Sequence, residues 1–144
     1  MPECRIALGL GCDRHTPLDT LQQAIAQALA QSGHTLAQVA TVASITLKAD
    51  EPAMLQLAAL QAWPIRFFRP QQLAVIEVPN PSDTVRKYTG TPSVSEAAAL
   101  LAGGQLLGLD QPLPMHALCV EKHRYRGADG KNATVSIALL PGSD

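Results

Sequence analysis

The residue types best suited to holding an anion are gathered between residues 79 and 104, where small hydroxyl and amide side chains are frequent. Ser82 can accept hydrogen bonds from the first amides of a short helix over 83–88, and Gly90 can end that helix in a left-handed conformation. Asn80 lies just before this helix and adds an amide donor. The pattern predicts a helix start with donors to spare for a carboxylate or phosphate.

A second helix begins within the next few residues, and its first residue is ambiguous. Thr91 followed by Pro92 fits one rule for a helix start, whereas Ser93 with Glu96 three residues later forms a capping box. Either start brings the positive end of a second helix dipole close to the first. We therefore predict an anion-binding segment here; the alternative is that these side chains only cap two helices.

A glycine loop, Gly9-x-Gly11, follows the first apolar run and leads to Arg14. Arg14 stands where a dinucleotide-binding Gly-x-Gly-x-x-Gly motif needs its third glycine, and no Gly-Lys-Ser/Thr phosphate loop is present, so nucleotide binding is not expected. The backbone at Gly11 can still approach another anion, and the Arg14 guanidinium can hold a carboxylate through two hydrogen bonds. The alternative is that Arg14 pairs with Asp13 or Glu51 at the surface.

The segment Lys48-Ala49-Asp50-Glu51-Pro52 carries side chains that could act on water. Asp50 or Glu51 could serve as the base, and Lys48 or Arg14 could stabilise an oxyanion. The alternative is that the two acidic residues only favour the start of a helix.

Cys12 lies before a helix start, a position that favours the thiolate, and His15 follows three residues later. A thiol enzyme is conceivable, but we favour the interpretation that Cys12 is a small apolar residue. The four histidines and three cysteines have no metal-ligand spacing and form no disulfide framework. No metal and no other cofactor is expected.

Basic residues cluster again between Lys122 and Lys131, and Asn132 ends the cluster. We expect them in the long loop of a hairpin whose strands are 115–121 and 133–140. This loop could close over an acidic ligand as a flap. The alternative is a loop whose charges only face water.

The elements that must position these residues alternate strand and helix along the chain. The expected strands are 4–10, 39–47, 65–68, 115–121 and 133–140, and the expected helices are 17–32, 52–62, 70–75, 83–88 and one that Gly103-Gly104 closes. This order predicts a three-layer α/β/α sandwich with a mixed, mostly parallel sheet that ends in an antiparallel hairpin. The loops after the parallel strands, 11–14, 48–51 and 68–70, should meet at one sheet edge.

Two of these helices carry more specific expectations. Thr16 is a candidate N-cap for the first helix, and Gly33 should end it. In the second helix, an apolar stripe of Leu55, Ala58 and Ala59 is expected to face the sheet.

Composition indicates one globular domain over residues 1–144, because 47% of the residues are hydrophobic and the length suits a single core. The net charge of -1 argues against nucleic acid as a partner. No apolar run reaches membrane-spanning length and no secretory leader is recognisable, so a cytoplasmic protein with reduced cysteines and no membrane contact is expected.

The order of these motifs resembles that of a known family. The stretches are Gly9-Leu10-Gly11-Cys12-x-Arg14, Lys48-Ala49-Asp50-Glu51-Pro52, Pro79-Asn80-Pro81-Ser82, Gly90-Thr91-Pro92-Ser93-Val94-x-Glu96, and Lys122 followed by Asn132-Ala133-Thr134-Val135. Together they resemble the CobE family, which is also the C-terminal domain of CbiG. The resemblance implies a role in cobalamin biosynthesis of the aerobic type, with precorrin intermediates. CbiG proteins of the anaerobic route open a lactone in a cobalt-precorrin and release acetaldehyde.

Three hypotheses follow from the residues and the resemblance together. The first is a protein that binds or carries a precorrin or hydrogenobyrinic-acid-like intermediate, with Phe68 or Tyr88 covering the ring. The second is a hydrolase for a precorrin lactone that uses Lys48, Asp50 and Glu51. The third is an interaction module for another enzyme of the pathway. The residues expected at the ligand are Gly11, Cys12, Arg14, Lys48, Phe68, Asn80, Ser82, Gly90, Thr91, Ser93, Glu96, Lys122 and Asn132.

Overall fold

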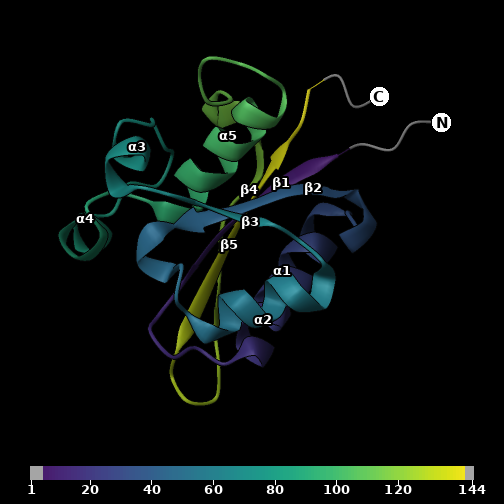
Figure 1. Cartoon of the computed structure of the whole chain (residues 1–144), viewed down its shortest axis with the longest axis vertical. Coiled ribbons are helices and arrows are strands. Elements are labelled where there is room, and N and C mark those ends of the chain that lie inside the picture. The colour runs from purple at the N-terminus through teal and green to yellow at the C-terminus, as the bar shows by residue number, and fades with distance from the viewer. Residues whose placement is uncertain (1–4, 142–144) are drawn as a thin grey trace.

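The fold is built on a five-stranded mixed sheet, seen here in a computed structural model that describes residues 5–141. The strand order is β3-β2-β1-β5-β4 (Figure 1). The strands are β1 (Ile6–Cys12), β2 (Val39–Ile45), β3 (Ile65–Phe68), β4 (Leu118–Arg126) and β5 (Asn132–Leu139). β1, β2 and β3 are parallel, and β5 is antiparallel to both β1 and β4, so β4 runs in the same direction as β1. This confirms the predicted α/β fold.

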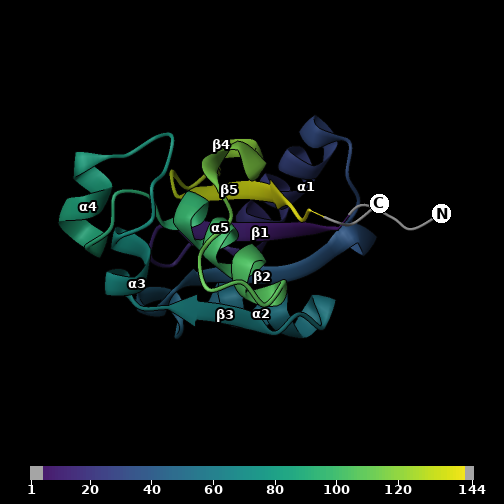
Figure 2. The ribbon, with the colours of Figure 1, turned by 90° about the horizontal axis from the view of Figure 1, so that it is seen from above.

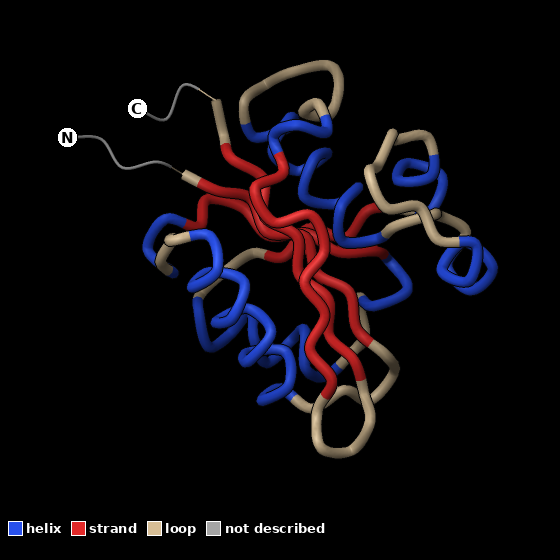
Figure 3. Tube along the Cα trace, turned by 180° about the vertical axis from the view of Figure 1, so that it is seen from behind, coloured by secondary structure: helices blue, strands red, loops and turns tan. Residues whose placement is uncertain are grey.

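Helices cover both faces of the sheet. α1 (Leu18–Ser32) and α2 (Pro52–Gln61) lie on one face, and α5 (Val94–Leu106) lies on the other (Figures 2 and 3). The short helix α3 (Pro70–Ala74) packs against α5, and a second short helix, α4 (Asp83–Thr89), lies further out from the sheet (Figure 2). Among residues 5–141, no helix is both long enough and apolar enough to cross a membrane.

Small residues bring α5 close to the central strand. A Cβ atom on Gly9 of β1 would overlap the Ser95 carbonyl oxygen of α5. Gly9, the first glycine of the Gly9-x-Gly11 loop, is therefore in contact with a helix backbone. Gly103 and Gly104 lie inside α5 and do not end it, so this expectation is wrong. Glycine is needed there for packing, because a Cβ on Gly103 would stand 2.5 Å from Leu113 Cδ1 in the chain segment that returns past the helix.

The local helix signals are partly confirmed. Gly33 and Gly90 end α1 and α4 in left-handed conformations, with φ of 75° and 82°. Ser82 caps α4, since its Oγ accepts a hydrogen bond from the Val85 amide at 3.2 Å. The prediction for Thr16 is wrong: Pro17 occupies the N-cap of α1, and the Thr16 hydroxyl donates to the Asp13 carbonyl at 2.7 Å.

The predicted stripe of α2 is also wrong. The buried residues are Ala53, Met54 and Leu57, whereas Leu55 is 52% exposed. Met54 and Leu57 are the larger pair on one helix face, and burying them removes more apolar surface from water than burying Ala58 and Ala59 would.

The hairpin differs most from expectation. β4 continues to Arg126, so only residues 127–131 form the loop. Pairing with β5 sets this length, since Arg124 lies opposite Thr134 and Arg126 opposite Asn132. Most of the basic cluster therefore belongs to a strand, and the expectation that it lies in a long loop is wrong.

Candidate functional site

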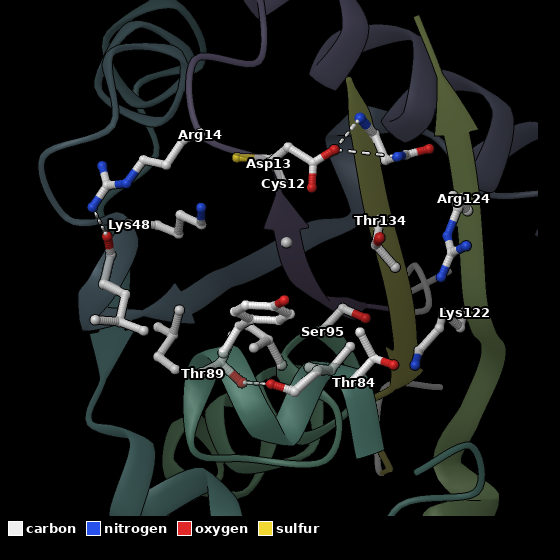
Figure 4. A pocket seen from close by; sticks show the side chains of 17 residues that line it. Cys12, Asp13, Arg14, Lys48, Thr84, Thr89, Ser95, Lys122, Arg124 and Thr134 are labelled. Atoms are coloured by element: carbon white, nitrogen blue, oxygen red, sulfur yellow. Dashed lines mark hydrogen bonds between the residues drawn. The ribbon is translucent and has the colours of Figure 1, made fainter. Parts of the chain in front are cut away.

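A cavity of about 650 Å³ opens where β1 and β2 end (Figure 4). Open α/β sheets bind ligands at the carboxyl ends of their parallel strands, which is where this cavity lies. We call it the main cavity. Its lining residues are Gly11, Cys12, Asp13, Arg14, Ile45, Leu47, Lys48, Thr84, Val85, Tyr88, Thr89, Val94, Ser95, Lys122, Arg124, Asn132 and Thr134.

One wall of the main cavity is cationic. Lys122 and Arg124 are two residues apart on β4, so their side chains extend from the same face of the strand (Figure 4). Lys48 faces the cavity from the short turn after β2. Within residues 5–141, none of these three cations forms an ion pair, although Lys122 Nζ donates to the Asn80 carbonyl at 3.2 Å. Their charge is available to a ligand.

The opposite wall is mostly apolar. It consists of Ile45 and Leu47 from the end of β2, Val85 and Tyr88 from α4, and Val94 from the start of α5. Tyr88 is 73% exposed, an unusual position for an aromatic ring. The main cavity therefore combines a charged edge with an apolar surface, which suits a ligand of the same two-sided character.

Arg14 is the fourth cation of the lining, but its charge is already balanced. Its Nη1 lies 2.9 Å from Asp50 Oδ1 and 2.9 Å from Glu51 Oε2, and its Nη2 donates to the Leu47 carbonyl at 2.7 Å. The hydrogen bond from Arg14 lowers the pKa of Asp50. The sequence offered Asp13 or Glu51 as the partner of Arg14. In the structure Arg14 pairs with Glu51 and also with Asp50.

The predicted catalytic segment is divided by the fold. Lys48 lines the main cavity, whereas Asp50 and Glu51 lie outside its lining and bind Arg14. Glu51 is fully buried, and its Oε1 accepts a hydrogen bond from the His15 amide at 2.5 Å. Glu51 thus connects the start of α2 to the loop that follows β1.

Cys12 lines the main cavity, but its chemistry is that of a neutral thiol. Burial raises the pKa of Cys12 to about 11, despite the opposing effect of nearby Lys48. A nucleophilic cysteine needs the thiolate at neutral pH. The buried environment of Cys12 disfavours this thiolate.

The capping segment turns most of its predicted donors away from the main cavity. Asn80, Ser82 and Gly90 are outside the lining, as are Thr91, Ser93 and Glu96. The lining residues from this segment are instead their neighbours on α4 and at the start of α5, among them Thr84, Thr89 and Ser95.

Only some of the buried polar atoms of that segment have a hydrogen-bond partner within residues 5–141. Ser93 is at the N-cap of α5 but makes no side-chain cap, and the capping box is absent because Glu96 Oε2 accepts a hydrogen bond from Asn80 Nδ2 at 2.7 Å. Asn80 Nδ2 also donates to Glu121 Oε1 at 3.0 Å. Thr91 and Ser93 are fully buried, and their side-chain hydroxyls have no hydrogen-bond partner within residues 5–141. The contacts of Asn80 connect the segment before α4 to α5 and β4.

Of the other predicted ligand residues, three line the main cavity and one does not. Gly11, Lys122 and Asn132 line the main cavity. Phe68 does not, because it is 5% exposed and packs in the core beneath α5, with Arg66 over its ring at 5.5 Å. The structure brings Arg14 and Lys48 to one site but leaves Ser82 and Thr91 beside it.

Several lining residues were not singled out from the sequence. The polar ones are Asp13, Thr84, Thr89, Ser95 and Thr134, whereas Arg124 was expected only as part of the basic hairpin loop. Asn132 and Thr134 are two residues apart on β5 and both line the cavity, as Lys122 and Arg124 do on β4. Period-two spacing would have revealed this surface had the strand been extended to Arg126.

A second hollow lies between residues 76–79 and 111–116. Its lining includes Glu77, Glu121 and His116 but no lysine or arginine. Because carboxylates repel anions, the second hollow is not suited to an acidic ligand.

Comparison with known proteins gives concordant results over most of the chain. The family model described as cobalamin synthesis G C-terminus matches residues 6–138. The crystal structure of CobE, a protein of the cobalamin biosynthetic pathway, has a TM-score of 0.79 and 32% identity, covering 97% of this chain and 94% of that chain.

Two relatives in sequence carry related names. A cobalt-precorrin-5A hydrolase of Priestia megaterium is 34% identical over 136 residues, 94% of this chain and 32% of the hydrolase. A protein CobE of Sinorhizobium sp is 37% identical over 102 residues, 69% of this chain and 66% of that protein. The chain thus spans about a third of the first relative and two thirds of the second. The resemblance carried by the sequence motifs is confirmed, and the chain belongs to the cobalamin synthesis G C-terminus family.

Proposed function

We propose that this protein binds a precorrin or related corrin intermediate of cobalamin biosynthesis in the main cavity, through the carboxylates at the ring edge. The observation that carries the proposal is the presence around one cavity of three cations, Lys48, Lys122 and Arg124, that have no counter-ion among the described residues 5–141, in a chain of net charge -1. Such a local surplus attracts an anionic ligand.

The geometry of the cationic wall suits several carboxylates at once. Lys122 and Arg124 are two residues apart on one strand, so their Cα atoms are about 7 Å apart. Two neighbouring acid side chains of one ring can reach them together. Arg124 can bind a carboxylate through two parallel hydrogen bonds, and Lys122 acts as a more compact charge.

The apolar wall suits the flat surface of the same ligand. Precorrins are large rings with apolar faces, and Leu47, Val85 and Tyr88 would cover part of such a face. A volume of about 650 Å³ is typical of a small-molecule site. A corrin with all its side chains exceeds this volume, so part of the ring would stay in solvent.

Titration with hydrogenobyrinic acid, followed by its absorption spectrum, tests the proposal. Lys122→Gln and Arg124→Gln should each weaken binding about tenfold, which corresponds to the loss of one charge-assisted contact. Arg86→Gln is the matched control, because Arg86 is an exposed cation of α4 outside the lining. Unchanged affinity in a variant carrying both cavity substitutions would overturn the proposal.

Hydrolysis of a lactone on the same ligand is a second candidate function. The observation that favours it is a carboxylate, Asp13, and an ammonium, Lys48, facing one cavity (Figure 4). Two relatives are named as cobalt-precorrin-5A hydrolases, and the chain matches about a third of each. Incubation with cobalt-precorrin-5A, followed by mass spectrometry, would reveal opening of the lactone, as the addition of one water with or without the loss of acetaldehyde.

A further inference from the structure

Asp13 is out of place in a cavity that only binds carboxylates. It is the one acidic residue in the lining formed by the described residues, and three unpaired cations surround the same space. A carboxylate there repels an acidic ligand and so weakens its binding. A contribution to chemistry would offset this cost.

The carboxylate of Asp13 is held by one oxygen and free at the other. Its Oδ2 accepts hydrogen bonds from the Asn132 amide at 2.8 Å and from Asn132 Nδ2 at 3.2 Å. Its Oδ1 has no partner within residues 5–141 and points into the main cavity (Figure 4). A group that is fixed at one oxygen and open at the other is suited to accepting a proton.

The loop that carries Asp13 is held firmly in place. The Asp13 amide donates to the Asn132 carbonyl at 3.0 Å, and the Thr16 hydroxyl donates to the Asp13 carbonyl at 2.7 Å. His15 has a φ of 63°, which is costly for a residue other than glycine, and its amide is held by buried Glu51. Strain of this kind persists where the surrounding structure enforces it and is common at active sites.

The space in front of Asp13 can receive a reacting carbonyl. A Cβ atom on Gly11 would meet only Thr134 Cβ, 3.8 Å away, so the floor of the cavity is open there. Lys48, from another wall, supplies a positive charge facing the same space (Figure 4). An ammonium near a developing oxyanion stabilises it.

From this geometry we infer that Asp13 is the catalytic base of the main cavity and acts on a water that attacks a lactone or ester carbonyl of the bound ring. The inference rests on the proposed function, since the ring must bind first. It assigns the role of base to a residue outside the Lys48–Glu51 segment. Asn132 is a positioning residue, because it acts through the Asp13 carboxylate.

The step balances without an oxidant or a metal. Water oxygen bonds to the carbonyl carbon while Asp13 Oδ1 takes one water proton, and the carbonyl oxygen becomes an oxyanion near Lys48. The carbonyl then reforms as the ring carbon–oxygen bond breaks, and the leaving alkoxide takes the proton from Asp13. The products are a hydroxyl group and a carboxylic acid on the opened ring.

The test measures binding and turnover of cobalt-precorrin-5A separately. Wild-type protein should bind this probe and open its lactone. Asp13→Asn should fold normally and bind as well or more tightly, because a repelling charge is lost, while kcat falls on the order of 100-fold. Asp19→Asn is the matched control, since Asp19 is an exposed carboxylate at the start of α1 outside the cavity. Asn132→Ala should lower kcat more than it changes KM.

Each outcome decides between the two proposals. Binding of the probe without hydrolysis by wild-type protein would overturn the inference and leave the binding function standing. Full turnover by Asp13→Asn, or loss of turnover only in Asp50→Asn, would overturn the assignment of Asp13. Absence of binding would overturn the binding function and the inference together.

Discussion

At the scale of single residues, a cation matters to a ligand only if its charge is not already balanced. Arg14 looks like the strongest anion-binding residue of the glycine loop, yet two carboxylates and a carbonyl occupy its guanidinium. Lys48, Lys122 and Arg124 are in less prominent motifs but have no counter-ion within residues 5–141. We therefore expect the charge that binds a ligand to lie with these three side chains.

Glu51 is expected to stabilise the loop after β1. In Glu51→Gln, one side-chain NH₂ must face either Arg14 Nη1 or the His15 amide, both of which are donors. Because Glu51 is fully buried, the free energy of unfolding should fall by about 2 kcal/mol. Urea denaturation measures this, with Glu77→Gln at an exposed site as the control. Equal loss in both variants would contradict the role of Glu51.

The thiol of Cys12 should resist alkylation at neutral pH. Its pKa is raised to about 11 by burial, and only the thiolate reacts. In a variant with Cys4→Ser and Cys119→Ser, the rate of iodoacetamide modification should therefore rise about tenfold per pH unit and level off near pH 11. A plateau near the value of a free cysteine, about 8.5, would show that burial does not control this thiol.

At the scale of elements, the two glycines of β1 have different tasks. Gly9 lets α5 approach, since a Cβ there would overlap the Ser95 carbonyl oxygen and stand 2.8 Å from the Ala99 amide nitrogen. Gly11 leaves open space in the cavity floor and has no positive φ, so alanine can adopt its backbone conformation. One glycine determines packing and the other determines room for the ligand.

Alanine substitutions separate these tasks. Gly9→Ala should lower the free energy of unfolding by about 3 kcal/mol, because a helix backbone must shift. Gly11→Ala should leave stability unchanged but weaken hydrogenobyrinic acid binding about tenfold by narrowing the cavity. Denaturation and spectroscopic titration on both variants check this pair. The reverse pattern would refute the placement of the cavity.

Helix α4 is expected to contribute contact with the ring face. None of its residues is buried, but Tyr88 and Val85 line the main cavity. Tyr88→Ala should weaken binding of the corrin by about 1 kcal/mol, and Tyr88→Phe should bind like wild type, because the ring provides the contact. Isothermal titration measures both. Equal weakening in the two variants would instead assign the effect to the tyrosine hydroxyl.

At the scale of the whole molecule, the site is a consequence of topology. β1 lies at the centre of the sheet, with parallel β2 on one side and antiparallel β5 on the other. The loops after β1 and β2 therefore lie close to β4 and β5 and line the main cavity with them. Residues of α4 and of the start of α5 complete the lining. Chain segments far apart in sequence supply the cationic wall and the apolar wall of one cavity.

The sequence predicted what depends on local chemistry. Ser82 and Gly90 bracket α4 as expected, because capping and left-handed turns are decided by neighbouring residues. The alternation of strands and helices also gave the correct fold class. Lys48 and Gly11 were placed at the sheet edge by the same topological rule that locates ligand sites in open α/β sheets.

What the sequence missed depends on long-range pairing. The partners of Arg14 lie 36 and 37 residues away, so only the fold decides whether Asp13 or Asp50 joins Glu51 in binding it. The length of β4 follows from its register with β5, which placed Arg124 on a strand and opposite Thr134. Ser93 and Thr91 had the right side chains for an anion, but the packing of α5 buries them.

The measurement that tests this account most directly is a crystal structure of the protein with hydrogenobyrinic acid bound. We predict the ring in the main cavity, with its carboxylate oxygens about 3 Å from Lys122 Nζ and the Arg124 guanidinium, and one ring face against Tyr88. A ring seated in the second hollow, or anywhere that leaves Lys48, Lys122 and Arg124 without contact, would contradict it.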